Sequence, residues 1–233
     1  MKRAAIDNEK LKKINNKVQD IFKKIEKASS IDELKKIEID LEEKYRLKES
    51  YPKIDFCVSK KDIESLIKDK IINSEDFSFN NSIAMNCLET PLEKLFYAMA
   101  WKGGHLSKLK HIIKGINDVN RSNEIPIDVK SAFVFYQFGR HLTDSAKEPI
   151  LDQHILRSFV ISKLDDSKEM VKYLELSQIK EKHWERFNDY KDWLNSLNKI
   201  NKIKDYSYYV DRILFALGKQ IKSTWKTDLN SIN

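Results

Sequence analysis

The sequence predicts an all-α protein, a multi-helix bundle that begins with a helical hairpin. Glycine and proline number only 5 and 4 among 233 residues, too few for the many tight turns of all-β and doubly wound folds. Helix formers such as leucine, lysine and glutamate are abundant instead. Apolar residues also recur at three- and four-residue steps along most of the chain, which is the spacing of one helix face.

The N-terminal hairpin is predicted from two such stripes within residues 1–52. The first stripe consists of Leu11, Ile14, Val18, Ile21 and Ile25. Ser30 and Glu33 then form a capping box that starts a second helix, which extends toward Tyr45 and is closed by Pro52. This pair is a coiled-coil arm, a dimer element acting through residues 7–50, or two helices packed on the core.

The remaining residues, 53–233, are expected to form one larger helical domain. Ser59 and Thr90-Pro91 are helix starts, and Gly103-Gly104 ends the strongly apolar helix that follows Pro91. Further helices are expected at about 106–119, 126–139, from 152 onward, 177–197 and 206–225.

The charge and the cysteine content limit which partners and which kinds of site are compatible with the sequence. The formal charge is +7 and the isoelectric point is about 9.1, which favours nucleic acid or another anionic surface, although a lysine-rich composition alone also produces such values. Two distant cysteines exclude a disulfide framework, a zinc ribbon and a four-cysteine iron–sulfur site within the chain. No apolar run is long enough to cross a membrane, so we expect a cytoplasmic protein without a membrane partner.

The segment Pro149-Ile150-Leu151-Asp152-Gln153-His154-Ile155-Leu156-Arg157 is the most informative part of the sequence. Asp152 precedes a helical apolar pattern, which places it at an N-cap, where its carboxylate would accept backbone N–H bonds. An N-cap aspartate needs no catalytic role, so both interpretations stay open at this point.

The order of motifs around this segment resembles the helix-hairpin-helix (HhH-GPD) DNA glycosylase superfamily. Ser107-Lys108-Leu109-Lys110-His111-Ile112-Ile113 is followed by Ile125-Pro126-Ile127-Asp128-Val129-Lys130-Ser131-Ala132, an apolar helix ending at Phe138-Gly139, and then the Asp152 segment. The resemblance covers roughly residues 90–162. It implies two helical lobes and cleavage of the bond between a damaged or modified base and its sugar, followed in bifunctional members by strand cleavage at the abasic site.

The resemblance also implies roles for individual residues. Asp152 would stabilise the positive charge that develops on the sugar, and Lys130 would be the nucleophile of a lyase step. A flipped-out base would lie against the aromatic residues Trp101, Phe96 and Tyr136, unless these pack in the core. DNA phosphates would be bound by Lys102, Gly103, Gly104, Lys108, Lys110, Lys114, Arg140, His154 and Arg157.

The chain departs from the family pattern at the hairpin. Ile127-Asp128-Val129 stands where the family has Gly-Val-Gly, so the backbone amides that approach a phosphate are not provided in the usual form. Gly103-Gly104 with its flanking lysines is the alternative phosphate site. The lysine-to-aspartate spacing, from Lys130 to Asp152, is also longer than usual, so a glycosylase that uses Asp152 alone is an equal alternative.

Three functions follow from these observations. The first is a DNA glycosylase, the second a DNA-binding relative without catalysis, and the third a helical protein-interaction module. The five histidines do not pair at metal-ligand spacing, so no metal and no cofactor are expected.

Overall fold

The computed structural model describes residues 8–47, 53–54, 56–119, 126, 129 and 132–227. These residues confirm the all-α prediction, because they form helices and, beyond them, only an isolated antiparallel bridge between Ile72 and Phe79. None of the described helices is both long enough and apolar enough to cross a lipid bilayer.

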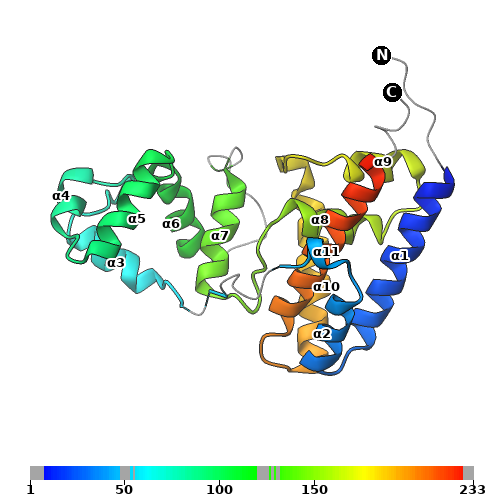
Figure 1. Cartoon of the computed structure of the whole chain (residues 1–233). Coiled ribbons are helices and arrows are strands. Elements are labelled where there is room, and N and C mark those ends of the chain that lie inside the picture. The colour runs from blue at the N-terminus through cyan, green and yellow to red at the C-terminus, as the bar shows by residue number, and fades with distance from the viewer. Residues whose placement is uncertain are drawn as a thin grey trace, which may run out of the picture. The chain divides into compact units, whose positions relative to one another are not determined.

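The chain divides into two compact units, whose composition differs in part from the predicted domains. Unit 1 combines Met1–Lys53 with Leu151–Asn233, and unit 2 is Ile54–Ile150. In Figure 1, unit 1 therefore contains the blue helices and the yellow-to-red helices, whereas unit 2 is cyan to green. The predicted break after residue 52 lies next to the observed one after Lys53, but the prediction missed a second break after Ile150, which joins the N-terminal hairpin to the C-terminal third of the chain.

Unit 1 is organised around its last helix. Its helices are α1 (Asn8–Lys27), α2 (Ile31–Ile39), α8 (Gln153–Ile161), α9 (Ser167–Leu174), α10 (Trp184–Asn201) and α11 (Tyr206–Thr227), with 3₁₀ turns at Glu43–Tyr45 and Glu181–His183. The helix α11 contacts α1, α2, α8, α9 and α10 (Figure 1). It can do so because it has buried residues on several sides, including Val210, Ala216 and Gly218.

The N-terminal hairpin packs onto α11 and is not a free arm. The apolar stripe of α1 is buried, from Leu11 to Ile25. Tyr206 Oη donates a 2.9 Å hydrogen bond to the Ile25 carbonyl oxygen, and Arg212 forms a 2.9 Å ion pair with Glu38. Because the stripe is already covered by its own unit, it is not the apolar face through which residues 7–50 were expected to self-associate.

One glycine sets the distance between α8 and α11. A Cβ atom built on Gly218 would lie 2.1 Å from the carbonyl oxygen of His154, far inside van der Waals contact. Ser158 supports the same crossing, since its Oγ donates a 2.8 Å hydrogen bond to the Leu214 carbonyl oxygen. The start of α8 is therefore held directly against the α11 backbone.

The described residues of unit 2 form five α-helices, two of which make a second close crossing. The helices are α3 (Lys60–Lys68), α4 (Asn81–Asn86), α5 (Pro91–Lys102), α6 (Leu109–Asn117) and α7 (Phe133–Thr143), with a 3₁₀ turn at Leu106–Lys108. Gly115 and Gly139 allow α6 and α7 to touch, because a Cβ on either would lie 2.0 Å from a carbonyl oxygen of the other helix. A small apolar core of Ile63, Ile72, Ile113 and Ile116 joins α3 to α6.

Several element boundaries differ from the predictions. The helices α4 and α9 were not predicted; they are only 6 and 8 residues long, too short for a clear periodic pattern. The second helix was expected to extend toward Tyr45, but α2 ends at Ile39 and a 3₁₀ turn follows. The helix α7 begins at Phe133 and continues past Gly139, which was interpreted as its end, because that glycine serves the crossing with α6.

Candidate functional site

Asp152 is the N-cap of α8, as the sequence predicts. Its backbone is extended, and its Oδ1 accepts hydrogen bonds from the backbone N–H groups of His154 at 2.6 Å and Ile155 at 3.3 Å. Both bonds fall on Oδ1, and Oδ2 has no hydrogen-bond partner within the described residues. The side chain is half-buried, so one carboxylate oxygen is held by the helix start while the other is uncommitted.

His154, two residues later, is a neutral hydrogen-bond donor. Burial, together with the positive charges of Arg157 and Lys222, lowers the pKa of His154 to about 4, although the charge of Asp152 acts in the opposite direction. Arg157 Nη1 lies 2.7 Å from His154 Nδ1. Because a guanidinium group can only donate, Nδ1 must accept, and the ring proton lies on Nε2.

Arg157 holds the start of α8 in place and does not reach an external ligand. The residue has an exposed fraction of 0%, and it donates to the carbonyl oxygens of Tyr173 at 3.0 Å, Gly218 at 3.0 Å and Leu176. Burial lowers the pKa of its guanidinium to about 10, so it is still charged at neutral pH. The prediction that Arg157 binds a phosphate is therefore withdrawn, because every contact direction of this group is filled by protein.

A second acidic residue of unit 1 was not singled out from the sequence. Asp211 on α11 accepts a short hydrogen bond from the hydroxyl group of buried Tyr190. Burial, with a contribution from the charge of Asp152, raises the pKa of Asp211 to about 7. The sequence signal was that Asp211 is the only acidic residue of α11 (Tyr206–Thr227) and follows the apolar and aromatic residues at its start.

Arg140, predicted to bind phosphate, is instead the centre of a buried network in unit 2. It is 2% exposed, forms a 2.8 Å ion pair with Glu148 and also donates to the carbonyl oxygens of Asp118 and Val119. Gln137 donates to the other Glu148 oxygen at 3.2 Å. We withdraw Arg140 from the nucleic-acid-binding set, because its charge is already compensated inside the protein.

The predicted lysine and glycine positions lie on α5, α6 and the turn between them. Gly103 ends α5, and Gly104 adopts φ +67°, a left-handed conformation that favours glycine. Lys102 and Lys110 are exposed, whereas Lys108 and Lys114 are half-buried. Lys108 Nζ lies 5.9 Å from the centre of the Phe135 ring. The sequence between residues 94 and 117 contains no acidic residue, so this segment is uniformly positive.

The three aromatic residues of the predicted base pocket have different environments. Trp101 and Phe96 are 65% and 61% exposed, whereas Tyr136 is 1% exposed. A side chain this buried presents no face to an incoming base, so Tyr136 is withdrawn. Lys130 lies outside the described residues. Asp152, His154 and Arg157 are thus brought together in unit 1, and the other described members of the predicted site belong to unit 2.

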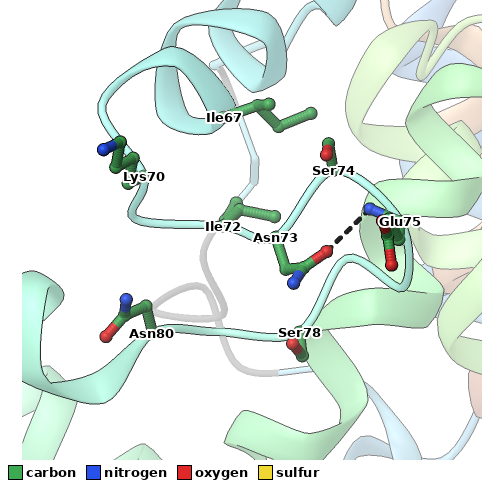
Figure 2. Close-up of a pocket in the computed structure, with 8 residues that line it drawn as sticks. All are labelled: Ile67, Lys70, Ile72, Asn73, Ser74, Glu75, Ser78 and Asn80. Atoms are coloured by element: carbon green, nitrogen blue, oxygen red, sulfur yellow. Dashed lines mark hydrogen bonds between the residues drawn. The ribbon is translucent and has the colours of Figure 1, made fainter.

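The structure also has a surface pocket, which is lined by other residues than these. It has a volume of about 490 Å³ and lies at the connection between α3 and α4 (Figure 2). Its lining is mostly polar and includes Lys70, Asn73, Glu75 and Asn80; Asn73 Oδ1 accepts a 2.7 Å hydrogen bond from the Glu75 backbone, drawn as a dashed line. The predicted site residues that the structure describes do not line it, and its polar groups are used in turns.

Comparison with known proteins identifies no relative. No family model matches the chain, and no curated protein or solved structure matches it at a significant level. The chemistry of the site must therefore be argued from its residues. A half-buried carboxylate with one uncommitted oxygen, beside a neutral imidazole N–H donor, can stabilise a nearby cation or accept a proton from water.

Proposed function

We propose that the chain is a DNA glycosylase that uses Asp152 to release a damaged or modified base. The observation that carries this proposal is the half-buried carboxylate of Asp152, which the first turn of α8 holds through Oδ1 beside the neutral ring of His154, whereas the cap residue Asp166 is exposed. The order of motifs across residues 90–162 and the basic composition support DNA as the substrate.

The reaction breaks the bond between C1′ of the sugar and a nitrogen of the base. As the bond lengthens, its electron pair leaves with the base and positive charge develops on the sugar ring, which the Asp152 carboxylate would stabilise. A water molecule then forms the new bond to C1′; one of its protons passes to Asp152 and from there to the departing base. The products are the free base and an abasic sugar.

The neighbours of Asp152 favour Asp152 as the group that accepts the proton. His154 is neutral at pH 7 and its Nδ1 is occupied by Arg157, so His154 does not compete with Asp152 as a proton acceptor through that nitrogen. Its Nε2–H is a donor.

Lys130 is retained as the nucleophile of a lyase step. A covalent complex that is trapped by borohydride and lost in Lys130→Gln would support that step, and its absence would leave a hydrolytic glycosylase.

The decisive experiment compares two N-cap aspartates. Duplexes carrying a panel of damaged or modified bases are incubated with the protein and treated with alkali, which cleaves the strand wherever a base was lost. Asp152→Asn keeps the capping hydrogen bonds, because asparagine caps as well as aspartate, but removes the charge. Asp166→Asn is the matched control: Asp166 caps α9 by accepting a 2.7 Å bond from the Glu169 backbone. We expect Asp166→Asn to retain activity and Asp152→Asn to lose it.

A DNA-binding protein without catalysis is the second candidate, and the acid-free segment 94–117 favours it. Its lysines can bind phosphates whether or not Asp152 acts on a base. This candidate predicts binding that weakens with salt in proportion to the number of phosphate contacts, together with no base release from any duplex of the panel.

A further inference from the structure

The helix α5 carries an apolar stripe that faces away from unit 2. Leu92, Leu95, Phe96 and Met99 follow the spacing i, i+3, i+4, i+7, which places them on one side of the helix. Their side chains are between 60% and 68% exposed. We call these four residues the α5 stripe.

On the opposite side of α5, Tyr97 attaches the helix to its own unit, while no residue of α5 is buried and Trp101 on that side is 65% exposed. Tyr97 lies across the helix from Leu92 and Met99; its hydroxyl group donates a 2.9 Å hydrogen bond to Asn81, and its ring packs 6.1 Å from that of Phe79. The orientation of α5 therefore leaves the stripe in solvent. A continuous apolar surface of this kind marks a binding site more often than isolated exposed residues do.

The charge around the stripe is positive. Lys102 lies on α5 beside the stripe, Lys94 lies on the side of Tyr97, and Lys110 follows on α6, where its charge acts on Asp76. All three lysines are exposed, and the acid-free segment 94–117 keeps this surface positive. Glu93, the acidic residue of α5, is occupied by the helix cap, where it accepts 2.8 and 2.9 Å bonds from the Thr90 and Glu89 backbones. The partner must therefore combine negative charge with apolar faces.

We propose that the α5 stripe binds DNA whose bases are unstacked, as in single strands, bulges and mismatches. Phenylalanine, leucine and methionine side chains insert between bases or stack on them, and the lysines contact the flanking phosphates. Paired, stacked bases present only their edges, so intact duplex engages the lysines but not the stripe. A second copy of the chain fits less well, because it would bring like-charged lysines together.

This inference shares with the proposed function the premise that DNA is the partner. It does not depend on Asp152, and its test measures binding to undamaged DNA. Loss of base release with intact stripe binding would count against the glycosylase alone, and the reverse result would count against the stripe alone.

The test compares the affinity for a single strand, a bulged duplex and an intact duplex of the same length, by fluorescence anisotropy. The variant is Phe96→Ser with Met99→Ser. Its control is Ile39→Ser with Ile200→Ser, which changes two similarly exposed residues of unit 1 (62% and 75%). We expect the stripe variant to lose roughly 10-fold or more in affinity for unstacked DNA, to change little on intact duplex, and the control to match the wild type.

Lysine variants provide a second measurement. Lys102→Gln with Lys110→Gln should lower the slope of log affinity against log salt by roughly 1.4 on a single strand, about 0.7 for each lost phosphate contact. The proposal is overturned if the stripe variant binds all three DNAs as the wild type does. It is equally overturned if that variant instead abolishes a dimer in light scattering, or abolishes binding to phosphatidylserine vesicles, with its DNA affinity unchanged.

Discussion

Replacing Gly218 by alanine should destabilise unit 1 and displace the start of α8. The new Cβ would lie 2.1 Å from the His154 carbonyl oxygen, so the α8 and α11 backbones must separate by about 1 Å. Overpacking of this kind costs about 1–3 kcal/mol, and contact with rigid backbone places it near the upper end. Alanine recovers about 1 kcal/mol of helix propensity. The net loss is about 2 kcal/mol, or roughly 4–8 °C in Tm for a chain of this size.

Thermal unfolding followed by circular dichroism measures this shift. Gly103→Ala is the matched control, because its Cβ would meet the His105 ring at 2.7 Å, an exposed side chain that can rotate away. We expect the control to stay within about 2 °C of the wild type. A Gly218→Ala protein as stable as the wild type would refute the close crossing and, with it, the rigid placement of Asp152.

Three further predictions concern buried charges. Because burial raises the pKa of Asp211 from 3.8 to about 7, the folded state binds an extra proton between these values, and this group's contribution to stability is lost as pH rises toward 7. Asp211→Asn should remove that decline in urea unfolding between about pH 4 and about pH 7; identical slopes in both proteins would contradict it. Arg157→Met removes the charged hydrogen bonds to the carbonyl oxygens of Tyr173 and Gly218, which should cost at least about 3 kcal/mol in the same assay, and an unchanged midpoint would argue against the buried guanidinium. Glu148→Gln should cost about 3–5 kcal/mol, because Arg140 would keep a buried charge without its counter-ion; thermal unfolding would show this loss, and a neutral effect would place Arg140 in solvent.

Much of the helical framework could be predicted from local patterns. The cap residues Ser59, Thr90 and Asp152 each start a helix where expected, because capping depends on a few neighbouring residues. The short helices α4 and α9 were missed because they contain too few turns to show a periodic apolar pattern. Gly139 was misinterpreted because its role comes from the Ile112 carbonyl oxygen on another helix.

The site was predictable only where its contacts are local. The cap geometry of Asp152 follows from its own segment, but the fate of Arg157 depends on Gly218, 61 residues away. From the sequence alone, a charged residue close to a candidate catalytic carboxylate is readily interpreted as a residue that binds the ligand. The same is true of Arg140, whose partner Glu148 lies beyond the end of its helix. The exposure of the α5 stripe was also not evident, because an apolar helix is expected to be buried.

The central claim is that the carboxylate of Asp152 takes part in base release. The most direct measurement is the single-turnover rate of base release, with enzyme in excess over a duplex that the wild type processes, for the wild type, Asp152→Asn and Asp166→Asn. Loss of a charge that stabilises the transition state predicts a rate at least about 100-fold lower for Asp152→Asn, with Asp166→Asn unchanged and the Tm of both variants close to that of the wild type. Equal rates for all three proteins would show that Asp152 is a helix cap and nothing more.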